Sequence, residues 1–129
     1  MPRKTFTAGE VLAASDVNQF LSNEIVLTSS TATAFTVATA DRYKTLMFTS
    51  GSAVTVTFGT ATAFQPGERV DIIQDGAGTV TITRDGTAVS LAGRGTAGTA
   101  YTIGQQYDAV SVVCVDTNAY RIIGNATAV

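Results

Sequence analysis

The spacing of apolar residues changes near residue 27, and the two parts of the chain predict different structures. Before that point, Val17, Phe20, Leu21 and Ile25 fall at i, i+3, i+4 and i+8, the spacing of one face of an α-helix. Ser15 suits the N-cap position, and the capping-box spacing from Thr7 to Glu10 offers an alternative start. A helix of about three turns is marginally stable alone in water. The pattern therefore predicts a short N-terminal amphipathic helix that docks on another surface.

From Ser29 onward, apolar and polar residues alternate, which is typical of β-strands with one face in water. Val54 and Val56, for example, alternate with Thr55 and Thr57. Strands are expected over residues 45–49, 53–58, 69–74, 79–83, 110–115 and 119–123, with Gly-, Pro-, Asp- and Asn-containing turns between them. The pattern predicts an all-β fold, an antiparallel β-sandwich or barrel of about eight short strands. Residues 1–30 form an N-terminal segment and residues 31–129 the β-rich domain.

Two of the expected strands are apolar on both faces. They contain Val70, Ile72 and Ile73, and the run over residues 110–115. Either these strands lie in the middle of a sandwich, or one of their faces packs against other copies of the same chain. Only 14% of the residues are charged, which favours a surface suited to assembly.

Composition limits the classes of partner. The length of 129 residues fits one domain. The net charge is −2, and the basic residues are scattered along the chain, which argues against a nucleic-acid partner. No apolar run approaches the ~18 residues of a membrane span, and no apolar stretch of a secretory signal follows Arg3 and Lys4. We therefore expect a protein folded in a cytoplasm, without nucleic-acid or membrane partners.

Residue types that carry out catalysis are scarce. The sequence contains no histidine, and its one cysteine, Cys114, lies in an apolar run typical of an inert core thiol. Residues 93–98 match the spacing of a dinucleotide-binding loop, but the residues after them are poor helix formers. A flexible loop between strands, with Arg94 at its tip, is the better interpretation. The sequence thus predicts no enzyme, no catalytic residues, no cofactor and no metal.

Aromatic side chains leave one binding function open. An exposed Tyr107 or Tyr120 would be the ligand platform for a sugar ring. The alternative function is therefore a carbohydrate-binding β-sandwich, an adhesin for a host-surface glycan, which would be stable as a monomer.

The beginning of the chain resembles a known family. The stretch KTFTAGEVL (residues 4–12), followed by ASDVN (14–18) and FL (20–21), resembles the N-terminal segment of small structural proteins of tailed bacteriophages. These are usually labelled minor tail, fibre or virion proteins. Four later stretches are similar in style to phage fibre and capsid decoration modules: SAVTVT (52–57), PGERVDIIQ (66–74), GAGTVTI (76–82) and AYRIIG (119–124).

The resemblance implies a structural role in a virion. Such proteins are commonly homotrimers whose β domains project outward while the N-terminal segment binds the particle. This chain would then be made in the cytoplasm of a host bacterium and would bind other copies of itself and other tail or capsid proteins. The attachment residues would be the apolar side chains of the N-terminal segment: Phe6, Val11, Leu12, Val17, Phe20, Leu21 and Ile25.

Overall fold

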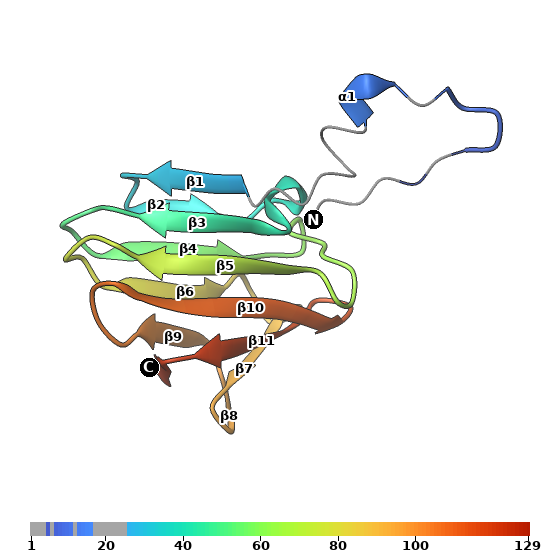
Figure 1. The fold of residues 1–129 in the computed structure, drawn as a ribbon. Helices are drawn as coiled ribbons and strands as arrows, with labels where there is room; N and C mark the ends of the chain where they lie inside the picture. The colour runs from blue at the N-terminus through green and yellow to red at the C-terminus, as the bar shows by residue number, and fades with distance from the viewer. Residues whose placement is uncertain (1–4, 6, 12, 17–25) are drawn as a thin grey trace.

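The computed structural model describes residues 5, 7–11, 13–16 and 26–129, and its fold is nearly all β. Two mixed β-sheets face each other (Figure 1). The seven-stranded sheet has the order β1 (Val26–Ser30), β3 (Lys44–Phe48), β5 (Arg69–Gln74), β10 (Asp108–Asp116), β11 (Ala119–Gly124), β7 (Ser90–Gly93), β8 (Thr96–Gly98). The five-stranded sheet has the order β12 (Ala126–Ala128), β9 (Ala100–Ile103), β6 (Val80–Arg84), β4 (Val54–Phe58), β2 (Ala34–Thr36). The all-β prediction is therefore confirmed.

The first six strands form a parallel coil. Successive strands alternate between the two sheets, so that β1, β3 and β5 lie side by side in one sheet and β2, β4 and β6 in the other (Figure 1). All four pairings among these strands are parallel. The prediction of an antiparallel fold is wrong for this part of the chain. Each bend takes the chain to the opposite sheet instead of to a neighbouring strand of the same sheet. When the chain returns to a sheet two strands later, it runs in the same direction as before, so neighbouring strands are parallel.

The second half closes the coil with mostly antiparallel strands. β10 runs antiparallel to both β5 and β11, and β7 pairs in parallel with β11. Residues 93–98, expected to be a flexible loop, instead form the turn and the second strand of the hairpin β7–β8. Arg94 and Gly95 at its tip have φ values of 47° and 79°, as a two-residue type I′ turn requires. Strand β9 follows, so the helix that a dinucleotide site needs does not occur there.

The hydrophobic core fills the space between the two sheets. Leu46, Ile72 and Val110 form one inward-facing row of the seven-stranded sheet, and Val56 and Ile82 face them from the five-stranded sheet. Burial of these side chains provides the main stabilisation of the fold. The thiol of Cys114 is buried in the same core, which confirms its prediction as a core residue.

The N-terminal part contains two short turns among its described residues. The Glu10 carboxylate accepts a hydrogen bond from the Thr7 amide at 3.0 Å, in a turn that Gly9 makes with a φ of 84°. One helical turn, α1, spans Ala14–Asp16. The rest of the predicted helix lies outside the described residues. Strand β1 begins at Val26, inside the range 1–30 assigned to the N-terminal segment. A 3-10 helix, η2 (Thr39–Asp41), connects β2 to β3.

Candidate interaction surface

The structure places the two candidate platform tyrosines in opposite environments. Tyr120 is fully buried, with its ring centroid 5.1 Å from that of Phe58 and 6.0 Å from that of Phe64. The prediction of Tyr120 as part of a ligand platform is therefore wrong. Tyr120 has the same strand parity as the buried Ile122, so both side chains face the core.

Burial has an electrostatic consequence at Tyr120 and at its cross-strand partner Cys114. Desolvation raises the pKa of the Tyr120 phenol above 10.0 and the pKa of the Cys114 thiol above 9.0. In the unfolded chain both groups lose their protons near these ordinary values. Above about pH 9 the unfolded state therefore binds fewer protons than the folded state, and the stability falls as the pH rises.

We expect the free energy of unfolding to be lower at pH 10.5 than at pH 8, and the Cys114→Ala variant to lose less over this interval than the wild type. Urea titrations of both proteins at the two pH values measure this difference. A wild-type stability that is equal at both values, or a variant with the same loss as the wild type, would contradict the assignment.

Tyr107 directly precedes β10, a central strand of the seven-stranded sheet, and is 75% exposed. Its backbone has a φ of 68°, which is unfavourable for a bulky residue. The Tyr107 amide donates to the Gln74 carbonyl at 2.6 Å, and the Gln106 side chain donates to the Asp75 carbonyl at 3.0 Å. These bonds fix the loop, which therefore presents an aromatic side chain to solvent from a constrained backbone.

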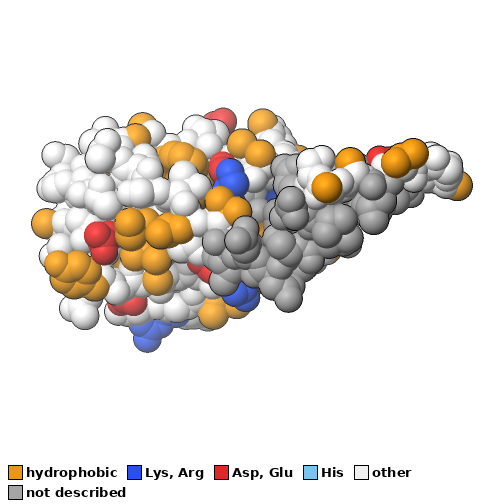
Figure 2. All heavy atoms as spheres, turned by 45° about the horizontal axis from the view of Figure 1, so that its top comes forward, with side chains coloured by type: hydrophobic (Ala, Val, Ile, Leu, Met, Phe, Trp, Pro, Cys, Tyr) orange, Lys and Arg blue, Asp and Glu red, His pale blue; other side chains and the backbone are white. Residues whose placement is uncertain are grey.

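We call the outward side chains of β1, β3, β5, β10 and β11 the outer face, and it combines apolar with polar side chains. In one row across the sheet, Met47 pairs with Ile73, and Ile73 pairs with Ala109. In the next row, Leu27 and Ile123 lie at the two ends and are 57% and 59% exposed, and the polar Thr45, Asp71 and Ser111 lie between them. Figure 2 shows hydrophobic side chains gathered on this side of the molecule. Exposed apolar side chains on a sheet that no further layer of described residues covers are typical of interfaces.

A shallow hollow of about 370 Å³ lies in this face. Its lining consists of Thr45, Asp71, Ile73, Ala109, Val110, Ser111 and Ile123. The Ser111 hydroxyl donates to the Asp71 carboxylate at 2.6 Å, and the Arg69 guanidinium lies 3.7 Å from the other carboxylate oxygen. The hollow thus combines apolar side chains with a half-buried carboxylate, a suitable combination for an amphipathic side chain.

The outward face of the five-stranded sheet is different. One row across it consists of Ala34, Thr55, Thr81, Thr102 and Thr127 in register. Short polar side chains of this kind are compatible with water. The outer face differs in carrying large apolar side chains, among them Leu27, Ile73 and Ile123, and it is therefore the candidate interaction surface.

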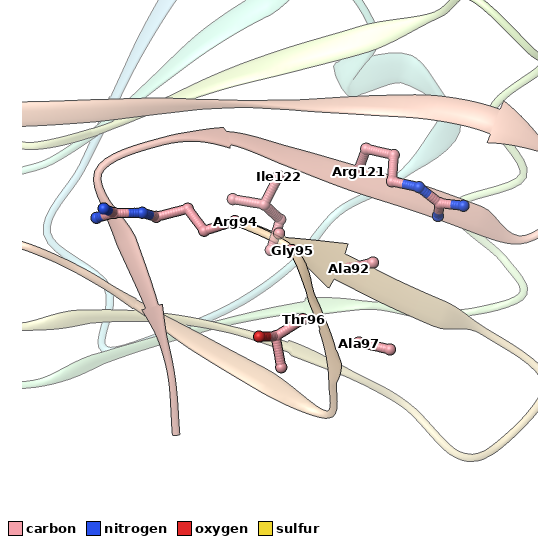
Figure 3. Close-up of a pocket in the computed structure, with 8 residues that line it drawn as sticks. Ala92, Arg94, Gly95, Thr96, Ala97, Arg121 and Ile122 are labelled. Atoms are coloured by element: carbon pink, nitrogen blue, oxygen red, sulfur yellow. The ribbon is translucent and has the colours of Figure 1, made fainter.

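A second hollow, of about 290 Å³, runs along the β7–β8 hairpin and β11. The Arg94 and Arg121 side chains leave it in opposite directions (Figure 3). The remaining lining residues are Ala92, Gly93, Gly95, Thr96, Ala97 and Ile122. No carboxylate lines it, so it offers no acid–base pair. Within the part of the chain that the structure describes, no cluster of acidic, Cys or His side chains is arranged to hold a metal ion.

The predicted attachment residues are described only at one position. Val11 is 84% exposed. The other six lie outside the described residues: Phe6, Leu12, Val17, Phe20, Leu21 and Ile25. Whether they form one surface therefore stays a prediction.

Comparison with known proteins gives no family for this chain. No protein-family model matches the sequence, and a search of curated proteins finds no match. Among the described residues, no helix combines the length and the apolar character needed to cross a bilayer.

Proposed function

We propose that the chain is a structural protein of a tailed-phage virion, without enzymatic activity. In this proposal it is a trimeric accessory fibre or decoration protein on the tail or capsid, attached through its N-terminal segment. The observation that carries the self-association is the group of large apolar side chains on the outer face, of which Leu27 and Ile123 are more than half exposed. The resemblance of residues 4–21 to phage structural proteins supports the virion role.

The self-association is tested by light scattering on a sizing column, with the full chain and a chain that lacks residues 1–25. The deletion ends before Val26 because β1 pairs with β3 and belongs to the sheet. We expect three times the monomer mass of 13.3 kDa in the full chain, and a trimer that persists after the deletion. A monomer in both forms would contradict the proposal.

The virion role is tested separately. Quantitative peptide mass spectrometry of purified phage particles from the same source is expected to find the chain in a fixed ratio to the major capsid protein. Its absence from intact particles would contradict a structural role in the virion, whatever its oligomeric state.

The exposed side chain of Tyr107 favours one second candidate, a carbohydrate-binding module. With Tyr120 in the core, such a module would rely on a single aromatic ring. Binding of the wild type to a glycan array, lost in a Tyr107→Ala variant, would support this function over the first.

A further inference from the structure

Tyr107 lies close to the hollow along the chain. Tyr107 is two residues before Ala109, which lines the hollow together with Ser111 from the same strand. The 75% exposure of Tyr107 means that its own molecule provides little packing for the ring. The chain therefore carries an exposed aromatic side chain and, a few residues away along the chain, an unfilled hollow that is partly apolar.

The chemistry of the hollow matches a tyrosine. Ile73 and Ile123 offer apolar contacts for a ring, and the Asp71 carboxylate can accept a hydrogen bond from a phenol. Asp71 already accepts from Ser111 and lies near Arg69, so its charge is partly compensated and its position is fixed. An aliphatic side chain would leave the carboxylate unused, whereas a tyrosine uses both parts of the hollow.

We propose that Tyr107 of one copy of the chain inserts into the hollow of a second copy. The inference rests on the self-association proposed above and names the contact that produces it. A knob and a hole carried by the same chain allow the contact to repeat from copy to copy, and the assembly closes as a ring or as a two-fold pair. The constrained backbone of the Tyr107 loop reduces the entropy lost when the ring is buried.

Charge and area agree with a second copy as the occupant. The outer face carries Asp71 together with Arg69 and Arg121, so both signs of charge are present and two copies need not repel each other. The five strands of the outer face are separated by four spacings of ~4.8 Å, which sets its width, and each strand contributes about five residues of ~3.4 Å, which sets its length. The product is a face of roughly 320 Å². A buried tyrosine adds ~150 to 250 Å². A contact of about 500 Å² per partner is small against the ~800 Å² of a standard interface, so we expect the association to be weak.

Light scattering and sedimentation equilibrium of four full-length proteins test this contact: wild type, Tyr107→Ala, Ile123→Asp and the double variant. Tyr107→Ala is expected to weaken association about 30-fold or more, as for an interfacial hot spot. Ile123→Asp should weaken it comparably, and the double variant should lose less than the product of the two effects because both changes disrupt one contact. Thr55→Ala, on the outward face of the other sheet, serves as the matched control and should associate like the wild type. Thermal unfolding of each variant shows whether it is folded.

The possible outcomes are distinct. A monomeric wild type would overturn both the contact and the proposed self-association. A wild-type oligomer that Tyr107→Ala leaves unchanged would overturn the contact alone. Loss of glycan binding in Tyr107→Ala without a change in association would also overturn the contact and assign Tyr107 to a sugar. Independent, multiplicative effects of Tyr107→Ala and Ile123→Asp would place the two residues in separate contacts and overturn the insertion.

Discussion

Replacing Gly78 with alanine is expected to lower the free energy of unfolding by about 3 kcal/mol, which is large for a single methyl group. A Cβ atom at Gly78 would lie 1.9 Å from the Ser52 carbonyl oxygen and 2.4 Å from the Ser52 carbonyl carbon. Both contacts are far inside van der Waals distance and both are with backbone, which cannot rotate away as a side chain can. The Gly78 amide also donates to the Ser50 carbonyl at 3.0 Å, so relief of the clash would strain this hydrogen bond.

Thermal unfolding by circular dichroism measures the effect, and a decrease in melting temperature of about 10 °C is expected for a chain of this size. Gly51→Ala is the matched control, because a Cβ there would have no neighbour within 4 Å. An equal change in the two variants would show that the bends of successive turns of the coil do not stack closely at this point.

The stacking of bends at Gly78 also explains which part of the fold the sequence could not predict. Six strands were predicted close to their observed positions, because alternation of apolar and polar residues reports which side chains face a core. The same alternation occurs in parallel and antiparallel sheets with one solvated face. The Ser50-Gly51 and Asp75-Gly76 turns look like hairpin turns, yet each leads to the opposite sheet. Only the long-range contact between such bends distinguishes a parallel coil from a sandwich of hairpins.

The candidate site was predictable to a similar extent. The adjacent Ile72 and Ile73 predicted a strand that is apolar on both faces, but the outward residues of β5 are Arg69, Asp71 and Ile73, so only Ile73 makes its outward face apolar. The adjacent Ile122 and Ile123 likewise indicate apolar side chains on both faces of a strand. Because residues two apart in a strand face the same side, a buried Ile122 could have predicted that Tyr120 also faces the core. The pairing of Ser111 with Asp71 spans 40 residues and depends on the register between β5 and β10, which no local pattern reports.

A second large effect is expected at Glu68, which is 1% exposed and lies in the turn before β5. One carboxylate oxygen accepts a hydrogen bond from the Gln65 amide at 2.6 Å, and the other lies 3.3 Å from the Arg42 Nε. The backbone of the same residue accepts from the Cys114 amide at 2.9 Å, so the turn also holds the end of β10. The Glu68 carboxylate thus stabilises a junction between the parallel coil and the antiparallel half.

Glu68→Gln is expected to reduce the free energy of unfolding by about 2 to 3 kcal/mol. This loss is smaller than the ~3 to 5 kcal/mol for breaking a fully buried ion pair, because the Arg42 side chain is 29% exposed. The glutamine carbonyl can still accept from Gln65, but its amide group faces the Arg42 guanidinium and both can only donate there. Urea unfolding measures the loss, with the exposed Asp85→Asn as the control, in which no comparable change is expected. If the ion pair carries the effect, Glu68→Gln will cost much less in an Arg42→Met background than in the wild type. An undiminished cost in that background would assign the stabilisation to the turn hydrogen bond with Gln65 instead.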